Sequence, residues 1–191
     1  MGRCKALLDY GGQTAIARLA AGAREGGKAG RIVVVAAEPH LDAVKEEARR
    51  FGLGVQINRH PENGRTGSVK LGLTAVRECD AAFIAPVDFP LATDGDFFAL
   101  RNSLQDSLAR FEDPIGAVPV SGGRGGHPIL FSRNGATRAM ALADDAPLRD
   151  ALNMPGGLVL RVPTSDSVLR NVDTPEDYQK TLESLAVKGS V

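Results

Sequence analysis

The 191-residue sequence has no excess of charge of either sign, and this balance excludes some classes of protein. Lysine and arginine together number 23, as do aspartate and glutamate, so the formal net charge is zero. A protein whose main task is to grip nucleic acid or an anionic membrane usually carries an excess of basic residues. No stretch interleaves basic and aromatic residues either, which argues against a DNA- or RNA-binding module.

Cysteines and long hydrophobic runs are also scarce. Cys4 and Cys79 form neither a metal-binding spacing nor a disulfide framework, so they predict two free thiols in a reducing cytoplasm. No apolar segment approaches the roughly 20 residues that span a bilayer, and no secretory signal opens the chain. We therefore expect a cytoplasmic protein with no membrane partner. The length, without repeats or linkers, predicts a single domain over residues 1–191.

Hydrophobic periodicity predicts that strands alternate with helices along the chain. The expected helices span about 13–26, 39–51, 68–77, 94–110, 135–142 and 147–152, with a final helix that opens at 173–177. The expected strands span 32–37, 55–58, 115–120, 128–131, 158–162 and 168–172, and a further strand begins at residue 81. This alternation predicts a doubly wound, Rossmann-like three-layer α/β fold with a mixed, mostly parallel sheet.

The stretch from Ala81 to Leu91 is the most informative part of the chain. Its apolar run predicts a buried, parallel strand that leads directly into Asp88, which is followed by Phe89 and Pro90. Ligands of open α/β sheets bind outside the carboxyl ends of the strands. A carboxylate at such an end can hold a divalent cation beside phosphate oxygens, although a turn or helix-cap aspartate fits the same pattern.

Several motifs, taken in order, resemble one family. They are Met1–Lys5, Asn58 with Gly64, Ser68 and Gly72, then Val87–Pro90, Gly126–Pro128 and Asn171–Asp177. Together they resemble the nucleotidyltransferases that act on the molybdenum cofactor, above all the cytidylyltransferase branch. The resemblance runs from Met1 to about Tyr178, and it implies the nucleotidyltransferase version of the three-layer fold.

The resemblance implies that the chain couples a nucleoside triphosphate to the phosphate of molybdopterin and releases pyrophosphate. The expected partners are CTP or GTP, the molybdenum cofactor, and a molybdoenzyme or its chaperone. By the same resemblance, Asp88 and Asp173 would ligate Mg²⁺, and Lys5 would neutralise phosphate. From the residues alone, Lys5 reads as solvated surface and Asp173 as a helix N-cap, a role that leaves one carboxylate oxygen for a cation.

The resemblance also implies a set of binding residues around the cleft. They are Asn58, Gly64 and Ser68 in and after a glycine-rich loop, Pro86 before Asp88, His127 in a Gly-His-Pro turn, and Arg149. Each has a simpler interpretation: Ser68 as a capping serine, His127 as a surface turn residue, and Arg149 as the i,i+4 helix partner of Asp145.

The sequence departs from the family pattern at specific places. The pattern begins with an apolar strand and a glycine-rich loop, upstream of the residue that is Met1 here. Phe89 stands where the family commonly has a polar residue, and Asp144 and Pro147 stand at two glycine positions. Two other functions therefore remain open: a sugar-phosphate nucleotidyltransferase of the same architecture, and a non-catalytic binder or chaperone of the cofactor.

Overall fold

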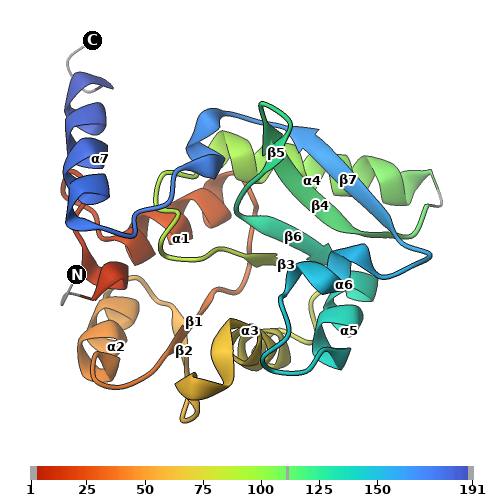
Figure 1. Cartoon of the computed structure of the whole chain (residues 1–191), viewed down its shortest axis with the longest axis horizontal. Helices are drawn as coiled ribbons and strands as arrows, with labels where there is room; N and C mark the ends of the chain where they lie inside the picture. The colour runs from red at the N-terminus through yellow and green to blue at the C-terminus, as the bar shows by residue number, and fades with distance from the viewer. Residues whose placement is uncertain (1–3, 111, 189–191) are drawn as a thin grey trace.

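The computed structural model describes residues 4–110 and 112–188, so Met1–Arg3 of the N-terminal motif lie outside the described residues. Helices and strands alternate through this range (Figure 1). The α-helices are α1 (Ala15–Glu25), α2 (Leu41–Arg50), α3 (Gly64–Ala75), α4 (Asp94–Ala109), α5 (Arg133–Ala141), α6 (Arg149–Asn153) and α7 (Pro175–Lys188). Short 3₁₀-helices are η1 (Lys5–Leu7), η2 (Pro61–Asn63) and η3 (Asp166–Leu169). No helix among the described residues has the length and hydrophobicity that crossing a membrane requires.

The strands form two sheets. In the smaller sheet, β1 (Val33–Ala36) pairs in parallel with β2 (Gly54–Ile57). In the larger sheet the order is β3 (Ala81–Ile84), β6 (Ile129–Ser132), β4 (Pro114–Ser121) and β5 (Arg124–Gly125), and β7 (Leu158–Pro163) also pairs with β4. The β4–β7 ladder is parallel, whereas β3–β6, β4–β6 and β4–β5 are antiparallel.

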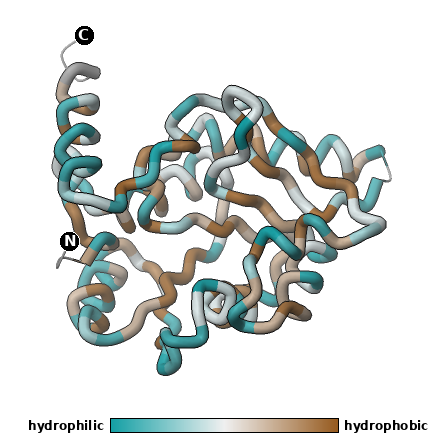
Figure 2. The backbone as a smooth tube through the Cα atoms, viewed as in Figure 1, coloured by the Kyte–Doolittle hydropathy of each residue, from teal (hydrophilic) through white to brown (hydrophobic). Residues whose placement is uncertain are grey.

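Helices cover both faces of the larger sheet, which confirms the predicted three layers. Leu130 packs with Leu100 and Leu104 of α4, while its neighbour Phe131 packs in the cluster that holds Ala139 of α5. Successive strand residues point to opposite faces, so these two clusters mark the two sides of the sheet. Figure 2 shows hydrophobic residues concentrated along the strands and hydrophilic residues in the loops and on the helices.

The segment that leads into α1 meets the last helix at one end of the molecule. The helix α7 stands beside the segment that leads into α1, away from the larger sheet (Figure 1). The Tyr178 hydroxyl donates to the Asp9 carbonyl at 2.6 Å, and the rings of Tyr10 and Tyr178 meet edge to face with centroids 5.3 Å apart. Burial raises the pKa of the Tyr10 phenol to about 12, so this phenol stays neutral even in moderately alkaline solution.

Helix starts follow the capping chemistry written in the sequence. The predicted start of α4 at Asp94 is confirmed. A capping box forms there, in which Asp96 N–H donates to Thr93 Oγ1 and Thr93 N–H donates to the Asp96 carboxylate. At α7 the cap is Thr174, which accepts from Asp177 N–H at 3.1 Å, with Pro175 as the first helical residue. The prediction that Asp173 caps this helix is therefore wrong.

Other expectations need correction. The strand that begins at Ala81 is half-buried and pairs antiparallel with β6, so the expectation of a buried, parallel strand is wrong, because an apolar run does not reveal the direction of the neighbouring strand. The segment 168–172 is not a strand: η3 ends at Leu169 and extended chain follows. The helix α3 begins at Gly64, so Ser68 lies inside it and caps nothing.

One close backbone approach sets the position of the turn before β6. A Cβ on Gly126 would lie 2.2 Å from the Val168 carbonyl oxygen, so only glycine fits there. We predict that Gly126→Ala lowers the free energy of unfolding by about 1–3 kcal/mol, because the backbone of η3 must move. Urea unfolding would measure it, with Gly30→Ala as control, since a Cβ on Gly30 meets nothing within 4 Å. Equal effects of the two variants would contradict the prediction.

Candidate active site

A backbone hydrogen bond joins the two loops that carry the predicted metal ligands. Asp88 lies in a turn after β3, where Phe89 N–H donates to the Pro86 carbonyl at 3.0 Å. Val172 N–H, from the segment before α7, donates to the Asp88 carbonyl at 2.7 Å. The next residue after Val172 is Asp173, so the structure brings the Asp88 and Asp173 loops side by side.

The Asp173 carboxylate is held from two sides. Lys5 Nζ lies 2.7 Å from Oδ1, and Asn171 Nδ2 donates to Oδ2 at 2.5 Å. The side chains of Lys5 and Asp173 are 31% and 50% exposed, so water screens the ion pair and its net stabilisation is at most about 1 kcal/mol. Lys5 is therefore paired rather than free in solvent, and little energy opposes its exchange onto a phosphate.

His127 projects from the turn between β5 and β6. Its backbone N–H donates to the Val168 carbonyl at 2.9 Å. Its ring packs on the Phe89 ring, with centroids 4.7 Å apart and an angle of 53° between the ring planes. Burial lowers the pKa of His127 below its ordinary value, the Asp88 carboxylate opposes this shift, and the Arg65 guanidinium adds to it. The imidazole is thus neutral at pH 7, and its buried Nδ1 has no hydrogen-bond partner among the described residues.

Arg65 is a site residue that the sequence reasoning missed. It is exposed in the first turn of α3, and its charge acts on His127 together with that of Asp88. The signal was present in the sequence: a cationic residue stands between Gly64 and Gly67, in a segment already assigned to the cleft. The start of α3 thus contributes a positive charge that acts on His127.

Three other predicted residues gather around α3. Asn58 is buried after β2, where its Nδ2 donates to Ser68 Oγ at 3.0 Å and its Oδ1 accepts from His60 N–H at 2.8 Å. Gly64 adopts φ +91°, and its closest non-local neighbour is the Asp144 carbonyl, 3.4 Å from an added Cβ. At Gly64 the backbone is therefore close to the Asp144 segment of the same chain. The ligand roles of Asn58, Gly64 and Ser68 remain predictions.

The remaining predicted residues lie at the edges of this region. Pro86 accepts the turn hydrogen bond from Phe89. Arg149 is exposed and begins α6, so Asp145 lies outside that helix and the predicted i,i+4 pair is wrong: no ion pair joins the two in the described chain. The ligand roles of Pro86 and Arg149 remain predictions.

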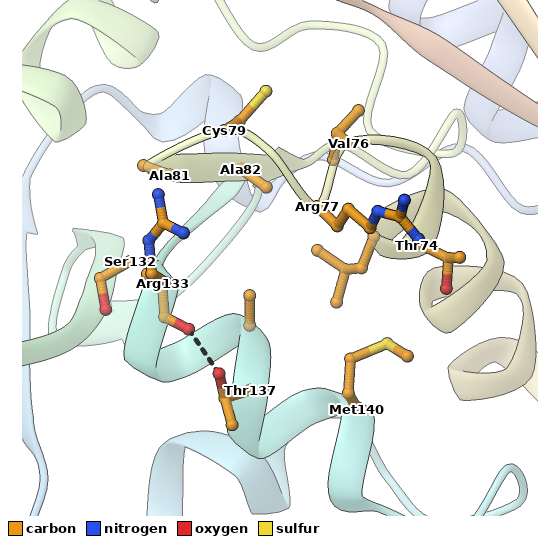
Figure 3. Close-up of a pocket in the computed structure, with 12 residues that line it drawn as sticks. Thr74, Val76, Arg77, Cys79, Ala81, Ala82, Ser132, Arg133, Thr137 and Met140 are labelled. Atoms are coloured by element: carbon orange, nitrogen blue, oxygen red, sulfur yellow. Dashed lines mark hydrogen bonds between the residues drawn. The ribbon is translucent and has the colours of Figure 1, made fainter.

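A separate hollow of about 310 Å³ lies between the end of α3, the strand β3 and α5. Figure 3 shows its lining, which includes Val76, Ala82 and Met140, and the hydrogen bond of 3.0 Å from Thr137 Oγ1 to the Arg133 carbonyl. No aspartate, glutamate or histidine lines it, and none of the predicted site residues does. The predicted site residues therefore lie at the carboxylate loops, around α3 and at α6, and not in this hollow.

Comparison with known protein families identifies the chain. Residues 1–159 match the model of the MobA-like NTP transferase domain. The chain belongs to this family. The matched residues include Lys5, Asp88 and His127, whereas Asp173 lies beyond them. As a MobA-like NTP transferase, the chain is a nucleotidyltransferase.

Solved structures support the fold of this MobA-like chain. The Rv0371c protein of Mycobacterium tuberculosis H37Rv is 22% identical, with a TM-score of 0.78 over 96% of this chain and 90% of its own, and it has also been solved in complex with manganese. The molybdopterin-guanine dinucleotide biosynthesis protein A of Archaeoglobus fulgidus is 13% identical, with a TM-score of 0.64 and coverage of 97% and 92%. A CMP:2-keto-3-deoxy-manno-octonic acid synthetase complexed with CTP is 15% identical, with a TM-score of 0.71 and coverage of 98% and 94%.

These similarities confirm the predicted nucleotidyltransferase version of the three-layer fold. A search of curated protein sequences found no match.

The pKa of His127 gives the site a measurable pH dependence. Because the folded-state pKa lies below the ordinary value of 6.5, the unfolded chain takes up this proton first as pH falls. The neutral imidazole therefore contributes fully to the free energy of unfolding above about pH 6.5, and this contribution is lost as the pH falls below that value. We predict that His127→Phe, which keeps an aromatic ring on Phe89, loses less stability than wild type between pH 7 and pH 5.

Urea unfolding without metal, at several pH values, would measure this difference. The control variant His40→Phe changes an exposed histidine and leaves His127 in place, so it should keep the loss on the acid side. Parallel pH profiles for wild type and His127→Phe would show that His127 is not held neutral by its surroundings.

Proposed function

We propose that this chain transfers a nucleoside monophosphate from a nucleoside triphosphate to the phosphate of molybdopterin and releases pyrophosphate. CTP is the favoured donor and GTP the alternative. The observation that carries the proposal is that the Asp88 and Asp173 loops are hydrogen-bonded to each other and that Lys5 of η1 pairs with Asp173. Two carboxylates and a weakly held lysine suit a reaction that needs positioning and charge neutralisation more than a protein nucleophile.

The donor set fits a magnesium ion that is shared with a substrate. Mg²⁺ is typically bound by one or two carboxylates while waters and substrate phosphates complete its octahedron. Asp88 and Asp173 supply such a pair, and the described residues contain no group of three or more His, Cys, Asp or Glu that could hold a metal without a substrate. When bound, the ion would neutralise charge on the phosphate oxygens.

Lys5 is the residue that would exchange partners on substrate binding. In the structure its ammonium neutralises Asp173 at 2.7 Å. A triphosphate at the carboxylate loops would offer Lys5 a stronger anionic partner and would release Asp173 Oδ1 as a ligand. Asn171 would keep Asp173 in place during this exchange, because it donates to the other oxygen.

The chemical step then needs no covalent intermediate with the protein. An oxygen of the acceptor phosphate attacks the α-phosphorus of the triphosphate, and the bond from that phosphorus to the bridging oxygen breaks. Pyrophosphate leaves with the electron pair. Arg65 adds positive charge on the side of α3, and the neutral ring of His127 on Phe89 offers an apolar face to a planar part of the acceptor.

Because a synthetase of a sugar acid, solved with CTP, has a similar fold, a phosphorylated or acidic sugar is the alternative class of acceptor. A second alternative is a cofactor binder without turnover. One assay separates the three, since pyrophosphate release can be followed with CTP or GTP, Mg²⁺, and molybdopterin or sugar acceptors.

We predict that Asp88→Asn lowers the rate of pyrophosphate release with CTP and molybdopterin by at least about 100-fold, because one charge of the metal site is lost. EDTA should have the same effect on the wild type. The control Asp106→Asn removes an exposed carboxylate of α4 that makes no hydrogen bond or ion pair in the described chain, and it should keep full activity. Full activity of Asp88→Asn would overturn the metal assignment.

A further inference from the structure

A second hollow, of about 470 Å³, lies beside the carboxylate loops. It is lined by the β4–β5 turn and by η3 with the chain that follows, through Ser121, Gly122, Arg124, Asp166, Leu169 and Arg170. Two arginines thus share one open depression on the surface. Neither the family match nor the resemblance gives these residues a role.

The two arginines that line this hollow have no acidic partner, whereas the Arg77 guanidinium, for example, lies 3.1 Å from Glu78. The side chains of Arg124 and Arg170 are exposed and make no hydrogen bond or ion pair among the described residues. Asp166 lies in the same hollow, but its Oδ1 accepts from Ser121 Oγ. The hollow therefore presents two guanidinium groups and one carboxylate, and its net charge is positive.

The backbone places this hollow next to the proposed site of the reaction. Arg124 is three residues from His127, and Arg170 is three residues from Asp173. Three residues of chain span at most about 11 Å, so the Cα atoms within each of these two pairs are no farther apart than that. The hydrogen bond from His127 N–H to the Val168 carbonyl, 2.9 Å long, holds the two segments together. A molecule at the carboxylate loops can thus extend into the hollow.

Guanidinium groups bind phosphate through charge-assisted and often bidentate hydrogen bonds. We infer that Arg124 and Arg170 form a phosphate subsite that holds the phosphate of the acceptor beside Asp88 and Asp173. The subsite rests on the proposed function, because it names the group that would deliver the attacking oxygen. It would also offset the repulsion between an anionic acceptor and the triphosphate, and it would orient the oxygen toward the α-phosphorus.

The first test is binding of inorganic phosphate to the whole chain in EDTA at constant ionic strength, followed through the side-chain Nε–H NMR signals of arginine. The Arg124 and Arg170 signals should shift in a saturable manner, and the exposed Arg31 should not. Asp166→Asn should strengthen binding, since it removes a negative charge and keeps the contact with Ser121. Shifts at Arg124 and Arg170 no larger than at Arg31 would overturn the subsite.

The second test is kinetic. With CTP, Mg²⁺ and molybdopterin, the double variant Arg124→Gln/Arg170→Gln should raise the KM for the acceptor at least 10-fold and leave the KM for CTP unchanged. The matched control Arg31→Gln/Arg110→Gln removes the same charge from exposed positions and should leave both KM values unchanged. If the double variant changes only the inhibition by pyrophosphate, the hollow binds the leaving group and the acceptor assignment is wrong.

The two proposals fail in different ways. Wild-type protein that releases no pyrophosphate with any acceptor would refute the proposed function, and the acceptor role of the subsite with it, even where phosphate shifts the two arginine signals. Turnover that depends on Asp88 but is indifferent to both arginines would refute the subsite alone.

Discussion

The hydrogen bond from Val172 N–H to the Asp88 carbonyl is the constraint on which the site depends. It joins residues that are 84 positions apart, and it fixes the loop of one predicted metal ligand against the loop of the other. Four residues earlier, the Val168 carbonyl accepts from His127 N–H, so the segment between η3 and α7 is held from two sides. A stretch with no strand pairing thus holds together the loops that carry the predicted site residues. Gly126 permits this arrangement, because any side chain there would collide with Val168.

Charge is balanced over the chain but not within the site. Lys5 and Asn171 hold the Asp173 carboxylate, the charge of Arg65 acts on His127, and Arg124 and Arg170 lie unpaired in the adjoining hollow. A neutral protein can therefore still carry a local positive potential suited to phosphates, since field strength near a surface depends on neighbouring charges more than on net charge. The weak, exposed pairing of Lys5 suits a residue that must exchange its partner when an anionic substrate arrives.

Local chemistry was readable from the sequence, and long-range contact was not. The capping residues Thr93 and Asp96 made the start of α4 predictable, and an apolar run ending near a carboxylate located Asp88. The segment 168–172 has the composition of a strand, yet it contacts two turns through single backbone bonds and forms no ladder. Ser68 resembled a cap because the glycines before it look like loop residues, although α3 already begins at Gly64. Arg65 needed the fold to bring its charge near His127.

The region that carries Asn58 and Ser68 depends on contacts with residues much later in the chain. Thr66 Oγ1 donates to the Ala146 carbonyl at 2.6 Å, Gly67 N–H donates to the Asp144 carbonyl at 3.2 Å, and Lys70 Nζ lies 2.7 Å from Asp144 Oδ1. Asp144 stands where the family pattern that the sequence resembles has a glycine, so its ion pair with Lys70 is a feature a glycine could not supply. The start of α3 is thereby clamped to the segment before α6. Because Asp88 and Asp173 take no part in these contacts, a change at this clamp can alter the region of Asn58 and Ser68 without altering the carboxylate loops.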